Sequence, residues 1–244
     1  YNAQVHERET IAAVAATYVQ SLREIIAHCA SAEAGGYTPS DFPLAQMSAA
    51  ELAAVVGEQR RGIEDVYPLS PMQEGLLFHS LYAPHGGLYV EQVQNLFKGA
   101  LDVRALRTAW ERVQERHAIL RSSFRWEGLR RPLQVVQQQA GLTWEEQDWR
   151  GLSSADQALR LEAFLNADRE RGFELAQAPL MRMTLLRLGE SEWQFVWSFH
   201  HILLDGWCTS LLLKEVFAFY EAASRGRELS LARPRPYRDY INWL

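Results

Sequence analysis

Apolar residues recur every three or four positions in several stretches of the chain, which is the spacing of an amphipathic helix. A Ser followed three residues later by Glu51 or Gln73 adds the capping-box pattern that begins a helix. Polar, Gly- and Pro-rich residues separate the first two stretches, at 32–44. The spacing and caps predict helices over residues 7–29, 154–171 and 207–223, a short helix after Ser48, and helices that begin at Ser70, Asp102 and about Tyr237.

Other stretches favour extended structure. Residues 89–98, 180–188 and 193–201 are rich in β-branched and aromatic residues and predict strands, and residues 119–126 and 132–138 also predict extended chain. The last two of the predicted strands are joined by a turn around Gly189. Because helices and strands alternate along the chain, we expect an α/β fold.

The composition is that of an ordinary globular protein. Of 244 residues, 48% are hydrophobic and 23% charged, and the net charge is −5. Basic residues are spread along the chain, which argues against a nucleic-acid partner, and no apolar run reaches the roughly 18 residues of a membrane span. Cys29 and Cys208 lie far apart in no CxxC pattern. They predict neither a metal site nor a redox pair, and they favour a reducing, cytoplasmic setting.

The candidate chemistry lies in the stretch FHHILLDGW, residues 199–207. Side chains alternate between the faces of a strand, so His200 and His201 should point in opposite directions and not bind one metal ion. His201 follows the aromatic positions on its face and is the better candidate for taking a proton from an amine or hydroxyl. Asp205 could orient a ring or fix the loop, and Gly206 would let a substrate approach the backbone. A histidine satisfied within the core, beside a simple Asp-Gly turn, is the structural alternative.

Four motifs, in order and at suitable spacing, resemble those of the condensation domains of nonribosomal peptide synthetases. The HHxxxDG motif is matched by His200, His201, Asp205 and Gly206. Residues 70–81 (SPMQEGLLFHSL) resemble the first family motif, residues 115–124 (ERHAILRSSF) the second and residues 237–244 (YRDYINWL) the fourth. Two positions depart from the family pattern, because Gly75 stands where arginine is common and Ala118 where glutamate is usual.

The resemblance implies a lobe like that of chloramphenicol acetyltransferase, with a mixed sheet flanked by helices. It also implies peptide-bond formation, in which a carrier-bound aminoacyl amine attacks a carrier-bound thioester. Both substrates would arrive on the 4′-phosphopantetheine arms of upstream and downstream peptidyl carrier proteins, with no bound cofactor. Neighbouring epimerization and adenylation domains would lie in the same chain.

The resemblance also assigns roles to residues. His201 matches the catalytic histidine of the family, as base or as positioning group, and His200, Asp205 and Gly206 complete the catalytic set. Asp205 matches a structural aspartate that is usually paired with an arginine. Arg121 and Arg116 are expected to have structural roles. Trp207, Ser70 and Gln73 are expected to line the substrate tunnel.

The chain is expected to divide into three parts. Residues 1–56 resemble the helical C-terminal tail of a preceding epimerization or condensation domain, with IIAHC at 25–29 and GGYTPSDFPLA at 35–45. Residues 57–64 form a linker, and residues 65–244 form the N-terminal lobe of a condensation domain whose C-terminal lobe is absent. We therefore expect the chain alone to be inactive, because the active site lies between lobes, and to self-associate through uncovered apolar surface.

The subtype and the reaction class leave alternatives. The spellings SPMQ and HHILLDGW resemble the subtype that accepts a donor ending in a D-residue, which an upstream epimerization domain would supply. An epimerization domain also carries HHxxxDG and would act at Cα of a carrier-bound residue. A condensation-like domain without activity could recruit carrier proteins, although the intact His201, Asp205 and Gly206 argue against it. A plant-type acyltransferase fits less well, since no DFGWG-like motif occurs.

Overall fold

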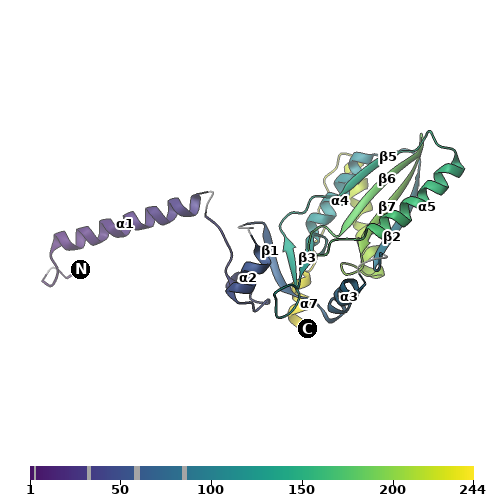
Figure 1. Cartoon of the computed structure of the whole chain (residues 1–244). Coiled ribbons are helices and arrows are strands. Elements are labelled where there is room, and N and C mark those ends of the chain that lie inside the picture. Colours follow the sequence, from purple (N-terminus) through teal and green to yellow (C-terminus); the bar gives the residue numbers. More distant parts are fainter. Residues whose placement is uncertain (3, 32–33, 58–60, 84–86) are drawn as a thin grey trace.

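The computed structural model describes residues 1–2, 4–31, 34–57, 61–83 and 87–244 (Figure 1). The helices are α1 (Arg8–Ala30), η1 (Pro39–Asp41), α2 (Ala49–Val56), α3 (Pro71–Tyr82), α4 (Val103–Arg116), η2 (Ala118–Arg121), α5 (Ser154–Arg171), α6 (Gly206–Ser224) and α7 (Tyr237–Trp243). The strands are β1 (Ile63–Pro68), β2 (Val90–Lys98), β3 (Ser122–Arg125), β4 (Leu133–Gln137), β5 (Trp144–Asp148), β6 (Met181–Gly189) and β7 (Glu192–His200). All the predicted helices form, with complete capping boxes at Ser48 and Ser70.

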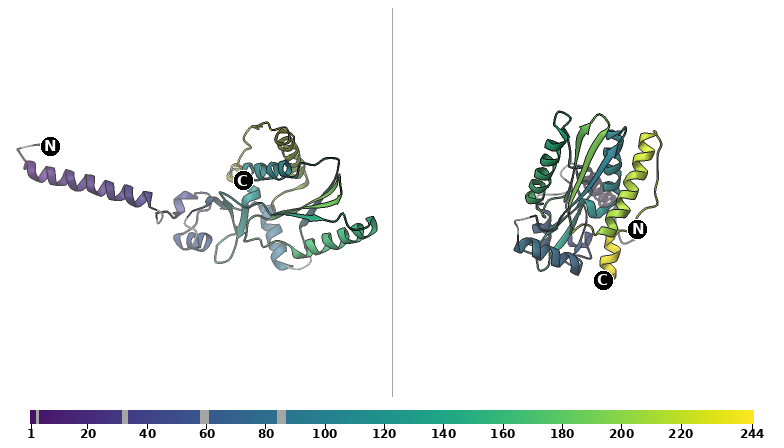
Figure 2. Two further views of the ribbon diagram at one scale, coloured as in Figure 1. Left: turned by 90° about the horizontal axis from the view of Figure 1, so that it is seen from above. Right: turned by 90° about the vertical axis from the view of Figure 1, so that its right-hand side faces the viewer.

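The strands form two sheets. One has the order β1-β4-β3 and the other the order β2-β7-β6-β5. Neighbouring strands are antiparallel except β5 and β6, which are parallel. The larger sheet is a layer between helices, with α5 on one face and α4 and α6 on the other (Figure 2). This mixed α/β lobe places the end of β7 beside α3, where the two predicted histidines occur.

Side chains on the two faces of β7 contact different helices, and the aromatic side chains of one face pack on α4. Phe195 and Trp197 lie against Trp110 of α4, with Trp110–Trp197 ring centroids 4.7 Å apart, and all three are buried. Aromatic pairs at this separation add packing energy beyond the area they bury. These three aromatic side chains therefore belong to the core.

The other face of β7 is attached to α5 by a buried polar cluster. Asp168 of α5 accepts hydrogen bonds from Ser198 Oγ at 2.6 Å and Gln92 Nε2 at 2.8 Å, and it pairs with Arg182 of β6. Burial raises the pKa of this carboxyl, but the hydrogen bonds outweigh burial and hold the pKa below its usual value. Asp168 is thus a buried anion whose partners come from three strands of the sheet.

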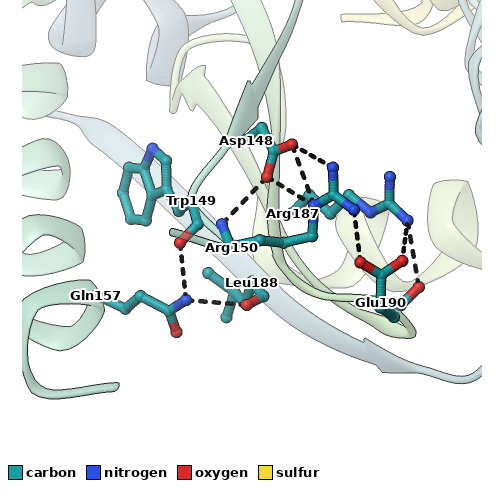
Figure 3. A network of polar contacts seen from close by, with 7 residues as sticks. All are labelled: Asp148, Trp149, Arg150, Gln157, Arg187, Leu188 and Glu190. Atoms are coloured by element: carbon teal, nitrogen blue, oxygen red, sulfur yellow. Dashed lines mark hydrogen bonds and ion pairs between the residues drawn. The ribbon is translucent and has the colours of Figure 1, made fainter. Parts of the chain in front are cut away.

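A second polar network lies at the opposite end of the larger sheet, beside the β6–β7 turn (Figure 3). Arg150 donates to Asp148 and Glu190, both at 2.6 Å, and Gln157 donates to the carbonyl oxygens of Trp149 and Leu188 at 3.0 and 2.9 Å. The ionic members are largely exposed, so each pair adds little stability. The network attaches the end of parallel β5 to β6 and to α5.

The segment before β1 packs against the smaller sheet. Phe42, Met47, Leu52 and Val55 form a buried cluster with residues of β1 and β4. In contrast, α1 has no buried residue and projects away from the lobe (Figure 1). The two parts of the predicted tail therefore differ: residues from 34 onward contribute to the core, and α1 does not.

Two strands were not expected, and two boundaries differ. Residues 63 and 64, expected in the linker, lie in β1, and residues 58–60 of that linker lie outside the described residues. The sequence pattern did not predict β1 because Glu64 and Asp65 are charged. In the structure they form ion pairs with Arg121 and Arg238, which are far away in the sequence. The unpredicted β5 is polar because it is an edge strand.

The extended segment predicted from residue 119 instead begins as η2. The backbone of η2 forms a tight turn, in which the Leu120 N–H donates to the His117 carbonyl at 3.0 Å. Strand β7 also ends at His200, so His201 lies in the following turn and not in the strand.

We expect Asp168→Ala to lower the free energy of unfolding by about 3–5 kcal/mol, because it leaves the Arg182 guanidinium buried without its partner. Urea unfolding of the two proteins measures the difference. Lys98→Ala is the matched control, because it removes a cation from an exposed ion pair with Glu192 and should cost under about 1 kcal/mol. Equal losses in the two variants would contradict this assignment.

Candidate active site

The candidate site is the turn that joins β7 to α6, residues 201–205. The His201 backbone N–H donates to the Tyr89 carbonyl at 2.8 Å, which attaches the turn to the start of β2. Tyr89 has φ of +63°, a conformation that is costly for a bulky residue. The surrounding structure therefore stabilises the strained backbone of Tyr89, which lies where the start of β2 meets the end of β7 and its two histidines.

The His201 ring has one occupied and one available nitrogen. Nδ1 lies 2.7 Å from the carbonyl oxygen of Leu204, which can only accept, so Nδ1 carries the proton. In the neutral ring Nε2 is then the hydrogen-bond acceptor, and no partner for it occurs among the described residues. His201 is half-buried. The ring is thus oriented by its own turn and can accept a proton at Nε2.

His200 is held in the opposite way. It is 3% exposed, and its Nδ1 accepts from the Ile202 N–H at 3.1 Å. Its Nε2 lies 3.2 Å from Ser80 Oγ, whose own proton goes to the Leu76 carbonyl, so Nε2–H donates to Ser80. Burial, and then the neighbouring His201, lower the pKa of His200 to about 4. His200, expected in the catalytic set, cannot exchange a proton without giving up one of these bonds.

Asp205, Gly206 and Trp207 begin α6. Asp205 is the N-cap, and its Oδ1 accepts from the Cys208 N–H at 2.7 Å, a bond that lowers the pKa of the carboxyl. No arginine pairs with Asp205 within the described residues, which differs from the pairing that we expected. A Cβ on Gly206 would meet no atom within 4 Å, and Trp207 is 78% exposed. These two residues present open surface beside His201.

Gln73 connects the first motif to the turn of His201. Its side chain is buried at the start of α3, where Ser70 Oγ accepts from its backbone N–H. Gln73 Nε2 donates to the Ile202 carbonyl at 3.3 Å and to Gln134 Oε1 at 3.0 Å. Gln73 Oε1 accepts from the Ser70 N–H at 3.0 Å and from the Tyr237 hydroxyl at 3.2 Å. Ser70 and Gln73, expected at the tunnel, therefore lie within the protein as connecting residues.

The two arginines of the second motif anchor backbone. Arg121 is buried and pairs with Glu64 at 2.7 Å, and Arg116 pairs with Glu215 of α6 at 3.1 Å. Their guanidinium groups also donate to the carbonyl oxygens of Gln114, Glu115 and Gln137, and of Leu231 and Ala232, respectively. Both arginines thus connect elements of the lobe, and neither has a hydrogen bond to His201 within the described residues.

Three residues around the site had no part in the sequence-based prediction. Tyr89 and Ser80 contact the histidine pair, but nothing in their sequence surroundings indicates it. Gln134 carried a usable signal, because it is a polar residue in the middle of the apolar stretch LQVV. A polar side chain at such a position is buried and must find hydrogen-bond partners.

Within the described residues, no group of three or more His, Cys, Asp or Glu side chains is arranged to hold a metal ion. In the same part of the chain, no helix is both long enough and apolar enough to cross a membrane.

Comparison with known proteins decides the family. The family model described as "Condensation domain" matches residues 63–244. This chain belongs to the condensation-domain family. The match begins at the first residue of β1 and contains the whole His201 turn.

The curated relatives are peptide synthetases. The chain is 51% and 46% identical to two different subunits of the linear gramicidin synthase of Brevibacillus parabrevis, over 244 residues in both comparisons. It covers 100% of its own length in each but only 5% and 3% of those proteins. It is 36% identical to surfactin synthase subunit 3 of Bacillus subtilis over 182 residues, 75% of the chain and 14% of that protein.

Solved structures confirm the expected fold. The starter condensation domain of rhizomide synthetase RzmA matches with a TM-score of 0.66 and 20% identity, over 73% of this chain and 44% of that one. A four-domain nonribosomal peptide synthetase matches with a TM-score of 0.62 and 18% identity, over 77% of this chain and 14% of that one. The lobe is therefore a mixed α/β lobe of the condensation-domain type.

The buried His200 predicts a pH dependence of stability. Because the pKa of His200 is about 4 in the folded chain and 6.5 for an unperturbed histidine, its contribution is fully present above pH 6.5 and is lost as the pH falls toward 4. The total is on the order of 3 kcal/mol. We expect urea unfolding of wild type to weaken more steeply over this range than that of His200→Gln. His28→Gln, at an exposed position of α1, should follow wild type; parallel curves for all three proteins would contradict the prediction.

Proposed function

We propose that this chain provides the His201-bearing lobe of a condensation domain that forms a peptide bond between two carrier-bound substrates. One observation carries the proposal: the half-buried His201 ring is fixed by its Nδ1–H bond to Leu204, and Nε2 is left as an acceptor with no partner among the described residues. Membership of the condensation-domain family supports the same assignment.

The proposed reaction needs one acceptor at this position. The amine nitrogen of the aminoacyl substrate bonds to the thioester carbonyl carbon of the donor, the C–S bond breaks, and the amine proton passes by way of Nε2 to the departing thiolate. General-base catalysis and positioning of the amine both use this acceptor. His200 maintains the turn, and the Asp205 cap holds the start of α6 next to it.

The substrates would be delivered on 4′-phosphopantetheine arms of upstream and downstream peptidyl carrier proteins, so that no resident cofactor takes part. Adenylation and epimerization domains would be neighbours in the same polypeptide. The relatives support this arrangement, because they are long synthetase subunits of which the chain covers only a few per cent.

We further propose that the donor ends in a D-residue and that residues 1–56 derive from the tail of a preceding epimerization or condensation domain. The SPMQ and HHILLDGW spellings support the first point. The second is supported by α1, which has no buried residue of its own, and by full-length matches to the synthetases that include it. An alternative is an epimerization domain acting at Cα, and the test below distinguishes the two.

Residues 1–244 alone should be inactive. Trp207 beside the site is 78% exposed, as are parts of α3 and α7, such as Met72 at 73% and Trp243 at 79%. Catalysis by positioning requires both substrates to be held in reacting geometry, which an open surface does not provide. The same apolar surface should favour self-association of the isolated chain.

The decisive variant is His201→Ala in the complete synthetase. With one carrier protein loaded with a D-ended peptidyl group and the next with an L-aminoacyl group, we expect peptidyl transfer to fall by roughly 10²–10⁴-fold, because the proton acceptor is lost. Intact-protein mass spectrometry follows the mass of each carrier protein. His28→Ala, at an exposed position of α1, should transfer at the wild-type rate.

Three other outcomes have clear meanings. Solvent deuterium at Cα of the donor without transfer would identify an epimerization domain. Carrier-protein binding without either reaction would leave a recruitment role. Transfer at an unchanged rate in His201→Ala would refute the assigned role of His201.

The donor subtype has its own test. Wild-type synthetase given matched donors that end in D- and L-residues should transfer the D-ended donor faster, as single-turnover rates measured by the same mass spectrometry. Equal rates, or a faster L-ended donor, would reject the proposed subtype and leave peptide-bond formation standing.

A further inference from the structure

We propose that Gln134 is a positioning residue for His201, acting through Gln73. This inference rests on the proposed function, because its consequence is measured as the rate of transfer. Gln134 lies in β4 of the smaller sheet, outside all four sequence motifs, and is 0% exposed.

Gln134 connects the smaller sheet to the catalytic turn by direct hydrogen bonds. Its Nε2 donates to Ser122 Oγ at 2.8 Å and to the Tyr67 hydroxyl at 3.1 Å, which belong to the two strands on either side of β4. Its Oε1 accepts from Gln73 Nε2 at 3.0 Å. Gln73 Nε2 in turn donates to the Ile202 carbonyl at 3.3 Å.

The Ile202 carbonyl determines which group donates and which accepts in each of these hydrogen bonds. The Ile202 carbonyl can only accept, so the NH₂ group of Gln73 must face it. The same NH₂ group then requires an oxygen from Gln134, which turns the NH₂ group of Gln134 toward Ser122 and Tyr67. The two buried amides thus have one consistent orientation.

The peptide groups around Ile202 are consequently held from both sides. The Ile202 N–H donates to the His200 ring, and the Ile202 carbonyl accepts from Gln73. Ile202 directly follows His201, and the Leu204 carbonyl that orients the His201 ring lies two residues further on. Loss of the Gln134 acceptor therefore removes one of the hydrogen bonds that orient the Gln73 amide against the turn that sets the direction of Nε2.

Gln134 has no route to a substrate by itself. It is fully buried behind Gln73, and its bonds run only to other buried polar groups. Its effect must pass through the His201 turn. That distinguishes a positioning role from a catalytic one and predicts a particular pattern in the kinetics.

The test uses Gln134→Met in the complete synthetase, with the carrier-bound substrates described above. Methionine keeps the length of the side chain and removes the acceptor for Gln73. We expect kcat to fall by roughly 10- to 100-fold with KM for the acceptor unchanged, because a small displacement of the base affects the reacting geometry. Gln114→Met is the matched control, because Gln114 is also a buried glutamine and its Nε2 has no hydrogen-bond partner among the described residues. The rate of this variant should equal that of wild type.

Two further variants test whether Gln134 acts through Gln73 and the His201 ring. Gln134→Glu, which is neutral when buried, keeps an acceptor for Gln73 and should transfer faster than Gln134→Met. In a His201→Ala background, Gln134→Met should cause no further loss, because both substitutions act through the same ring. A merely structural role would lower the folded fraction and reduce both backgrounds equally.

The outcomes separate this inference from the proposed function. Wild-type transfer that His201→Ala abolishes, together with an unchanged kcat in folded Gln134→Met, would overturn the positioning role alone. An additional loss in the double variant would also overturn it. Transfer that does not depend on His201 would overturn the proposed function itself.

Discussion

The hydrogen bond between the buried amides of Gln73 and Gln134 joins the smaller sheet to the start of α3 and, through Gln73, to the turn of His201. Gln73 belongs to the first motif, and its partners Ile202 and Tyr237 belong to the third and fourth. Gln134 adds Ser122 of the second. Buried polar groups must be hydrogen-bonded, and a fully satisfied network has one arrangement only. Groups from all four motifs thus meet in one hydrogen-bond network around these two buried amides.

The same constraint explains why two adjacent histidines have different properties. His200 is the last residue of β7 and is buried, with both ring nitrogens bonded and its pKa lowered to about 4. His201 is one residue further, where the chain leaves the sheet, and of its two ring nitrogens only Nδ1 has a hydrogen-bond partner among the described residues. A buried neutral imidazole supports the turn, whereas the next imidazole keeps one ring nitrogen without a described partner, and the proposed function rests on that nitrogen. The two histidines differ because β7 ends between them and not because of their residue type.

The larger sheet supplies the rigidity that this arrangement needs. Its aromatic face packs on α4, and its polar face is attached to α5 through the buried Asp168. Ionic contacts at the far end, around Arg150, are exposed and contribute much less. The end of the sheet that carries the histidines is thus attached by buried contacts. Catalysis by proximity requires the reacting group to be positioned on a rigid element of this kind.

Local periodicity and short motifs were enough to predict the helices, the capping boxes at Ser48 and Ser70 and the α/β class. The choice of His201 as the catalytic histidine stays a prediction. The sequence patterns missed β1 and β5, since Glu64 and Asp65 are stabilised in β1 by arginines far away in sequence, and β5 is a polar edge strand. The burial of Ser70 and Gln73 as connectors, the cap that Asp205 forms on α6 and the closeness of Gln134 to the site emerged from the folded chain alone. The physical reason is that hydrogen bonds between residues 61 or 129 positions apart, such as Gln73–Gln134 and Gln73–Ile202, leave no periodic trace in the sequence.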